Sequence, residues 1–411
     1  MKYPNTQIPK HPMQSSKNIR TQSRKENQNQ QMLTTQNRGN GISARSGGGV
    51  FSVLGFWRSS FLGYLGIWVF AYLGIWVFGY LGNYAVAQQD TAPELTAEAS
   101  QAIDKGLKHL LATQRADGSW ASSEEGQREV AVTSLALMAF MSKAEFPGFG
   151  PNGEALNKAK DWLLKTAENS PEGYMGATMY EHGLATLALT EMWGMTRDKE
   201  EDDAIQKAVE AAVDVILKSQ KDKGGWWYQP SADRGQGDTS VTVMVFVALA
   251  SARQAGIVVP NETIAKVVAY FESAANQDTG GFKYRPTGGK HSNSIACTGG
   301  GAYAAQLAGE RGTEMVMSAL RFLKERSPGI INNNFGHYYY GHYYAIQAMV
   351  QAGDEFYADW YPLIRDALIR KQNKNGSWGK NYKGKKTTGY ETPMAIIILA
   401  TPHRYIPIYQ R

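Results

Sequence analysis

Two kinds of helical segment alternate along most of this chain, and they differ in how apolar positions are spaced. From Ala204 to Ser219, apolar side chains recur at helical spacing with charges between them, which predicts a helix that covers a core with one face. From Ser240 to Ala252 almost every position is apolar, which predicts a helix buried on all sides. The second kind recurs at Ala131 to Met141, Gly183 to Met192, Thr298 to Leu307, Tyr343 to Val350 and Met394 to Ala400.

A short motif joins the two kinds of segment: glutamine, three residues, glycine, one residue and an aromatic residue. Full copies run from Gln114 to Trp120, Gln220 to Trp226 and Gln372 to Trp378; a degenerate copy ends at Phe282, and worn copies end at Tyr174 and Phe335. The copies define a period of roughly 50 residues and therefore six helix pairs. Two-helix repeats either stack open-ended or close into a ring. Six pairs favour an all-α fold, an (α/α)6 toroid whose inner helices surround a central cavity.

These repeats resemble the QW motifs of squalene-hopene and oxidosqualene cyclases, whose fold is shared with protein prenyltransferase β subunits. The resemblance covers roughly Leu95 to Arg411. It implies a terpenoid cyclase-like toroid with an isoprenoid or other apolar ligand in its cavity. It also implies that the motif residues tie helix ends together, a role that suits a glycine-containing turn beside unpaired helix termini. The residues with this structural role are Gln114, Trp120, Gln220, Trp226, Phe282, Gln372 and Trp378.

The acid motif of squalene-hopene cyclases is incomplete in this chain. In those enzymes the segment is Asp-x-Asp-Asp-Thr, and its central Asp protonates the alkene. Here Asp238 and Thr242 match, but Ser240 stands at the position of that acid. Serine does not supply the strong, dry carboxylic acid that this step needs, so a competent squalene-hopene cyclase is not expected. The candidate catalytic residues are Asp238, Glu181 and His182, with helix capping as the competing role of Asp238.

Candidate ligand-binding residues gather where the buried helices begin. Aligning the repeats on a recurrent Ala-Leu pair places Glu129, Glu181 and Glu391 at one level in neighbouring repeats of a closed ring. Helix capping is the alternative role of these carboxylates. Aromatic residues open the same helices and offer a ligand an apolar body with a polar tip. The candidate ligand-binding residues are Tyr180, Trp227, Tyr339, Tyr340, His342, Tyr343, Tyr390 and Glu391.

A metal site is not expected. The prenyltransferase branch of the fold holds zinc with an Asp, a Cys and a His, and Cys297 and His342 resemble two of these ligands. Ile295 stands where the carboxylate would be expected, so we predict neither a metal nor another cofactor. Cys297 is the only cysteine, which excludes an intramolecular disulfide and predicts a core position. The Cys-Gly-Glu-Gln signature of thioester domains is absent.

The composition changes sharply before residue 88. Residues 1–58 are basic and rich in Gln, Asn, Ser and Gly, which predicts a disordered tail. Residues 59–87 contain the uncharged apolar run Phe61 to Gly82 and end at Ala87 in a small-x-small pattern. This predicts a signal peptide cut after Ala87, or an uncleaved membrane anchor through residues 59–82. Both predict that the toroid domain, residues 95–411, is exported to the periplasm or the cell exterior, or is membrane-anchored there.

The charge distribution argues against a nucleic-acid partner. Residues 1–87 hold nine Lys and Arg residues against Glu26 alone, and the remaining chain has 34 basic and 36 acidic residues. Three hypotheses of function remain. They are an enzyme that acts on isoprenoids with an unusual acid, a non-enzymatic binder of lipid or peptide, and an interaction module whose cavity is filled by its own side chains. The expected partner is an apolar small molecule or lipid, with possible association to a membrane.

Overall fold

The computed structural model describes residues 93–121, 128–233, 235–287, 294–332, 337–379 and 389–410. The predicted tail (1–58), the predicted signal or anchor (59–87) and the worn motif copy at Phe335 lie outside these ranges. Within them, no helix combines the length and the apolar content that crossing a membrane requires.

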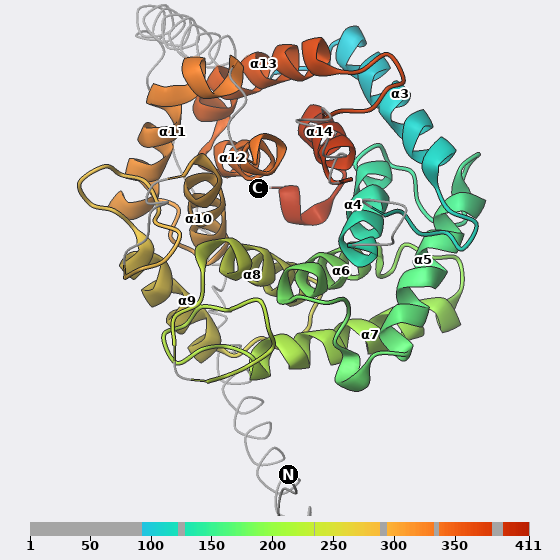
Figure 1. The fold of residues 1–411 in the computed structure, drawn as a ribbon, viewed down its shortest axis with the longest axis horizontal. Coiled ribbons are helices and arrows are strands. Elements are labelled where there is room, and N and C mark those ends of the chain that lie inside the picture. Colours follow the sequence, from blue (N-terminus) through green and yellow to red (C-terminus); the bar gives the residue numbers. More distant parts are fainter. Residues whose placement is uncertain are drawn as a thin grey trace, which may run out of the picture. The chain divides into compact units, whose positions relative to one another are not determined.

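The described residues form six pairs of α-helices, numbered as in Figure 1. The outer helices are α3 (Ala97–Thr113), α5 (Gly153–Glu168), α7 (Lys199–Lys218), α9 (Asn261–Ala274), α11 (Glu314–Asn332) and α13 (Asp354–Lys371). The inner helices are α4 (Glu129–Met141), α6 (Met179–Met192), α8 (Thr239–Gln254), α10 (Ile295–Leu307), α12 (Tyr338–Ala352) and α14 (Glu391–Leu399). A one-turn helix, η1 (Pro171–Gly173), precedes α6.

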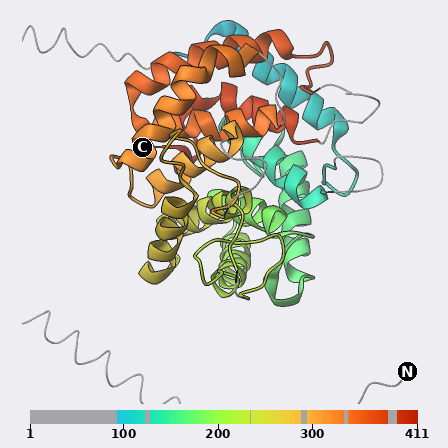
Figure 2. The ribbon, with the colours of Figure 1, turned by 60° about the vertical axis from the view of Figure 1, so that its left-hand side comes forward.

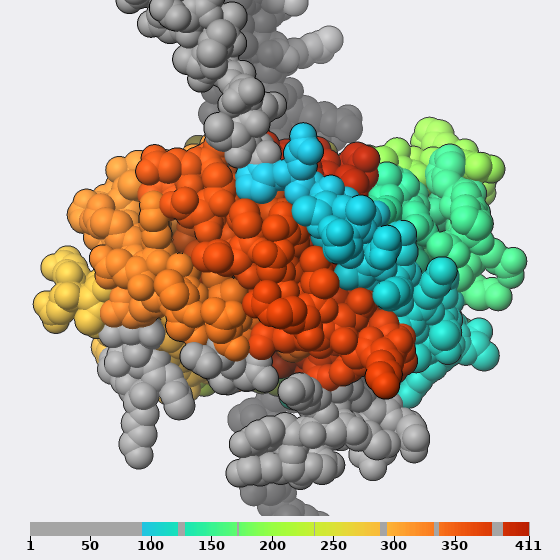
Figure 3. All heavy atoms as spheres, turned by 90° about the horizontal axis from the view of Figure 1, so that it is seen from above, coloured from blue at the N-terminus to red at the C-terminus, as the bar shows by residue number. Residues whose placement is uncertain are grey.

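The helices close into a ring of two layers. Each inner helix contacts the next one along the chain, and α14 contacts α4 (Figure 1). In the outer layer α13 lies against α3, so the last pair meets the first (Figures 2 and 3). The prediction of an all-α (α/α)6 toroid is therefore confirmed.

The hydrophobic pattern explains which helices lie inside. The outer helix α7 buries one stripe, with Ile205, Val209 and Ile216 fully inaccessible, whereas nearly every residue of α8 is buried. Polar side chains cap three of the inner helices, α6, α8 and α10. Thr178 caps α6 and Asp238 caps α8, each by accepting a hydrogen bond from a backbone N–H in the first turn.

Glycines on α10 bring its two neighbours unusually close. A Cβ atom on Gly299 would lie 2.8 Å from the backbone nitrogen of Ala345 in α12, and one on Gly300 would lie 3.0 Å from Val243 in α8. Any larger residue would push these helices apart. The close approach lets long side chains of α12 reach past α10 toward α8.

The chain after α14 enters the ring instead of following its outside. Residues 400–410, here called the C-terminal plug, contain the one-turn helices η2 (Thr401–His403) and η3 (Pro407–Tyr409). Figure 1 shows this segment near the centre of the ring, and η3 contacts α8 and α12. Ile406, Ile408 and Tyr409 are buried there. Pro402 and Pro407 keep this segment from continuing as a regular α-helix, and it packs inside the ring (Figure 1).

Candidate functional site

The three tryptophans of the motif make the same contacts, each in its own repeat. The indole N–H of Trp120, Trp226 and Trp378 donates to the carbonyl ten residues earlier in the preceding outer helix, at 2.8 Å in each case. Their backbone N–H groups donate to a threonine hydroxyl of the following inner helix, and that of Phe282 does the same. These threonines are Thr133, Thr242, Thr298 and Thr392. The motif thus joins the end of each outer helix to the start of its inner helix.

The motif glutamines join each repeat to the next. The side-chain amide of Gln114 donates to the backbone carbonyl of Ala155 in α5, and that of Gln220 donates to the backbone carbonyl of Thr263 in α9. Gln372 donates to Ala102 in α3 at 2.8 Å, so the last repeat is tied to the first by the same bond. We call this set of glutamine, tryptophan and threonine contacts the repeat clamp.

One of the two histidines predicted to be functional, His182, takes the place of the clamp threonine in its repeat. His182 is fully buried in the first turn of α6. Its Nδ1 accepts a hydrogen bond from the Met175 backbone N–H at 3.1 Å, and its Nε2 lies 3.0 Å from the Ala212 carbonyl. Burial lowers the pKa of His182 to about 4, so the ring is neutral near pH 7 and donates from Nε2. This geometry favours a structural role over proton transfer.

His342 lies near the start of α12, and the worn motif copy of its repeat, at Phe335, lies outside the described residues. It is fully buried, its Nε2 lies 3.3 Å from the Ile330 carbonyl, and burial lowers its pKa to about 3. The Trp360 ring packs beside it, with 5.9 Å between the ring centroids. Like His182, it faces the protein core and not an open cavity.

The three rim carboxylates lie on neighbouring inner helices but have different surroundings. Glu181 accepts a hydrogen bond from the Ala177 backbone N–H at 2.6 Å, which completes the cap of α6. Glu129 forms an ion pair with Arg115, and Glu391 lines a pocket. Counted from the clamp residues, the three glutamates do not share the one level that the sequence alignment predicted. Glu181 and Glu391 stand one residue before a clamp residue, whereas Glu129 stands four before Thr133, about one helical turn away.

No group of three His, Cys, Asp or Glu side chains in the described part of the chain is arranged to hold a metal ion. Cys297 is buried, and burial raises the pKa of its thiol to about 11, so the thiol stays protonated. That environment suits a core cysteine.

A chain of tyrosines crosses the lumen of the toroid. Successive ring centroids lie 5.9 Å apart from Tyr180 to Tyr340, 5.0 Å from Tyr340 to Tyr344 and 4.9 Å from Tyr344 to Tyr343. Tyr303 and Tyr409 extend the cluster at 6.4 and 6.2 Å. We call these six residues the luminal tyrosines. Tyr180 and Tyr340 keep some accessible surface although the inner helices surround them, and the other four are buried. Burial raises the pKa of all six hydroxyls.

The C-terminal plug closes the lumen at the C-terminal ends of the inner helices. The Tyr303 hydroxyl donates to the Ile408 carbonyl at 3.0 Å, and the Gln351 amide donates to the Gln410 carbonyl at 2.7 Å. The buried Glu191 accepts hydrogen bonds from the Ser251 hydroxyl at 2.5 Å and from the Ile408 backbone N–H at 3.4 Å. Burial raises the pKa of Glu191 to about 7, well above that of an ordinary glutamate.

Asp238 is a buried acid at the opposite end of the lumen. One carboxylate oxygen caps α8 by accepting from the Val241 backbone N–H at 3.0 Å and from the Ser240 hydroxyl at 2.6 Å. Its second oxygen, Oδ2, is buried and has no hydrogen-bond partner within 3.5 Å among the described residues. Burial raises the pKa of Asp238, and hydrogen bonding from Ser240, Val241 and the Tyr284 hydroxyl opposes that rise. The residue is both the predicted cap and a candidate proton donor.

Of the other predicted aromatic residues, Trp227, Tyr339 and Tyr390 lie around this mouth. The Arg285 guanidinium covers the half-buried Trp227 ring, 4.5 Å from its centroid. The Tyr339 hydroxyl accepts a hydrogen bond from the Gly379 backbone N–H at 3.2 Å. Tyr343 belongs to the buried part of the lumen, and the half-buried Tyr390 precedes Glu391 at the start of α14.

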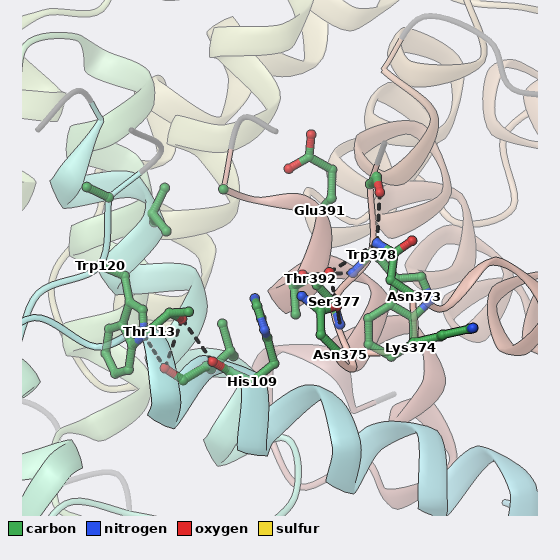
Figure 4. A pocket seen from close by; sticks show the side chains of 15 residues that line it. His109, Thr113, Trp120, Asn373, Lys374, Asn375, Ser377, Trp378, Glu391 and Thr392 are labelled. Carbon is green, nitrogen blue, oxygen red and sulfur yellow. Dashed lines mark hydrogen bonds between the residues drawn. The ribbon is translucent and has the colours of Figure 1, made fainter. Parts of the chain in front are cut away.

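A polar pocket of about 810 Å³ lies at the seam where the last repeat meets the first. Residues from the end of α3, the 373–379 turn and the start of α14 line it, and we call it the seam pocket. In Figure 4 His109 points from α3 toward the turn that carries Ser377. Among its lining residues, our sequence-based ligand set contained Glu391 and missed His109, Lys374 and Asn375. The relative register of α3 and the last motif turn, which only the closed ring fixes, was the missing information.

Comparisons with known proteins support the fold. Neither protein-family models nor curated protein sequences match this chain. Among solved structures, it is similar to the type II terpene cyclase MstE from Scytonema, with a TM-score of 0.51 and 16% identity over 75% of this chain and 100% of that one. It is also similar to the GH76A α-1,6-mannanase from Salegentibacter sp. HEL1_6, with a TM-score of 0.55 and 11% identity over 75% of this chain and 99% of that one. At these identities the likeness extends to the α/α toroid fold and no further.

Proposed function

We propose that this protein binds an apolar, isoprenoid-like ligand at the mouth of the toroid lumen and does not cyclise it. The observation that carries the proposal is the accessible aromatic surface of Tyr180 and Tyr340, which face each other from α6 and α12 above a lumen closed by the C-terminal plug. Aromatic rings with few polar partners suit the C–H surface of a prenyl chain. The fold shared with a terpene cyclase supports this by analogy alone.

Binding without turnover agrees with the contacts of the candidate catalytic groups. His182 holds two backbone groups, and Glu181 completes a helix cap. The Ser240 hydroxyl donates a hydrogen bond to the Asp238 carboxylate, and a serine hydroxyl is not a strong enough acid to protonate an alkene. The hydrogen-bonding groups of these residues therefore contact backbone groups and the caps of inner helices.

Asp238 favours a second candidate function, an acid-catalysed reaction of the same ligand. Its unpartnered Oδ2 and raised pKa are the features expected of a carboxylic acid that keeps its proton in a dry site. In that case Asp238 would protonate an alkene or epoxide of the bound isoprenoid, and Asp238→Asn would abolish the reaction while leaving binding in place.

Retention of a prenyl probe by the purified full-length chain tests the proposal. We expect a fluorescent geranylgeranyl probe to bind the wild type and to bind Tyr340→Ala at least about tenfold more weakly, because the variant removes a ring from the mouth. Tyr405→Ala is the matched control, since Tyr405 is 46% exposed within the C-terminal plug. Equal binding by the wild type and Tyr340→Ala would contradict the proposed site.

Mass spectrometry of the recovered probe separates the two candidate functions. Unchanged probe from the wild type supports binding alone. A new isomer or hydrated product that disappears in Asp238→Asn would establish the acid-catalysed alternative in its place.

We also propose that the toroid acts outside the cytoplasm, either exported or anchored through residues 59–82. The apolar run Phe61 to Gly82 and the small residues that end at Ala87 support this. Expression of the full-length gene, followed by cell fractionation and N-terminal sequencing, tests it. A cytoplasmic protein that retains Met1 would contradict it.

A further inference from the structure

The seam pocket occurs at a position that other junctions between repeats fill. At four described junctions the glycine of the motif lies against a carbonyl oxygen of the next outer helix. A Cβ atom on Gly118, Gly224, Gly280 or Gly376 would lie 2.4, 1.9, 2.7 or 2.3 Å, respectively, from the oxygen of Lys158, Lys266, Ser318 or Lys105. These carbonyls therefore mark equivalent positions around the ring.

The residue four positions after each of these carbonyls differs between the seam and the other three junctions. The position holds Trp162, Tyr270 and Phe322 at three junctions and His109 at the junction of the last repeat with the first. Tyr270 is fully buried, and its hydroxyl donates to the Gly237 carbonyl at 3.2 Å, so it packs firmly beside its turn. At a fifth junction, where Gly173 lies against Ala211, the corresponding residue is Val215, and the aromatic Tyr174 follows the glycine.

His109 is smaller than those three aromatic residues and remains half-buried. No hydrogen bond of its ring to the described residues is found, although the ring points into the seam pocket (Figure 4). Burial lowers the pKa of His109 below its ordinary value, so the ring is neutral near pH 7 and offers one donor and one acceptor.

The other lining residues give the pocket a balanced, polar character. Among the described lining residues, Lys374 is the single Lys or Arg and Glu391 the single carboxylate, so the formal charges of these two offset each other. Asn375 uses its side-chain oxygen within the turn, where it accepts from the Ser377 hydroxyl at 2.8 Å. Its amide N–H₂ group makes no bond to the described residues and is available to a ligand. Trp120 and Trp378 form part of the wall, but they are 2% and 1% exposed and offer a ligand almost no ring surface.

We propose that the seam pocket binds a neutral oligosaccharide. The imidazole of His109 and the amide N–H₂ group of Asn375, among described lining residues whose formal charges offset, suit the hydroxyl groups of a sugar. A phosphate or sulfate ligand would require a net positive charge. A purely apolar ligand would leave the imidazole and the amide without partners, which is unfavourable. The volume of about 810 Å³ falls in the usual range for small-molecule sites.

The test is to fill the pocket as the other junctions are filled. His109→Trp copies Trp162, and Lys108→Trp is the matched control because Lys108 is the exposed neighbour of His109 on α3. The labelled full-length proteins are applied to an array of neutral and acidic oligosaccharides. We expect the wild type and Lys108→Trp to bind neutral oligosaccharides and His109→Trp to lose that signal. Thermal denaturation verifies that each variant is folded.

A second filling variant, His109→Phe, copies Phe322 and replaces His109→Trp if the indole prevents folding. The proposal is overturned if the wild type binds no neutral oligosaccharide, if it binds only acidic ones, or if folded filling variants bind as well as the wild type. The result is independent of the prenyl-probe experiment, since none of the luminal tyrosines lines the seam pocket.

Discussion

At the mouth of the inner-helix barrel the same contacts recur from repeat to repeat, whereas at the closed end each contact occurs once. Around the mouth, tryptophan, threonine and glutamine residues repeat the clamp, and His182 takes the threonine position in one repeat. At the closed end, Glu191, Tyr303 and Gln351 each hold a different atom of the C-terminal plug.

This difference separates the contacts that build the ring from the contacts that are specific to one place in it. A contact that recurs every repeat is explained by the architecture, even when its residue type looks catalytic. A buried polar group that occurs once, such as Glu191, has no such explanation and is the better candidate for function. The seam pocket follows the same logic, because His109 departs from the aromatic residues at three equivalent positions.

The largest expected effect comes from removing one clamp tryptophan. Trp226→Ala deletes a fully buried ring together with the bond from its indole N–H to the Ile216 carbonyl. We expect a loss of about 4 kcal/mol in the free energy of unfolding. Trp227→Ala is the control, since that neighbouring ring is half-buried and should cost much less. Denaturant midpoints of the two variants measure the difference, and similar losses would mean that the clamp has no special weight.

The closed end should make stability depend on pH through Glu191. Its pKa is raised from 4.5 in the unfolded chain to about 7 in the fold, so the folded state retains a proton that the unfolded state releases. The contribution of Glu191 is therefore fully present below pH 4.5 and is lost as the pH rises through 7, by about 3 kcal/mol in total. Unfolding measured from pH 4.5 to 8 should show this fall in the wild type relative to Glu191→Gln.

The comparison with Glu191→Gln is needed because His182 acts in the opposite direction. Its pKa is lowered to about 4, so the folded state lacks a proton that the unfolded state takes up below pH 6.5. Its contribution is present above pH 6.5 and is lost as the pH falls toward 4. If the wild type and Glu191→Gln have parallel pH profiles, Glu191 does not titrate in this range.

A smaller effect should identify His182 as a clamp residue. His182→Ala leaves the Met175 N–H and the Ala212 carbonyl without their partner, and we expect a loss of about 2 kcal/mol. His182→Thr should recover part of this loss, because threonine fills the same position in the repeat of Trp226. Thermal unfolding of both variants decides the matter, and a threonine variant no better than alanine would count against the equivalence.

Some features of the candidate site could be predicted from the sequence, and others could not. The positions of Asp238 as a helix cap and of the motif residues at the repeat junctions follow from local spacing. The threonine that recurs early in four of the inner helices was also visible and would have indicated a structural role for His182. Alignment on Ala-Leu pairs hid it, because small apolar pairs recur at several levels of a buried helix and moved Glu129 by about one turn.

By itself, the sequence determined the two classes of helix, the six repeats and their closure, because apolar spacing and turn chemistry act within about 50 residues. Only the tertiary structure decided that the C-terminal plug enters the lumen, that Tyr180 meets Tyr340 across it, and that His109 opens a pocket beside Ser377. These contacts join residues far apart along the chain. Their pairing depends on the diameter and register of the closed ring, which no local pattern specifies.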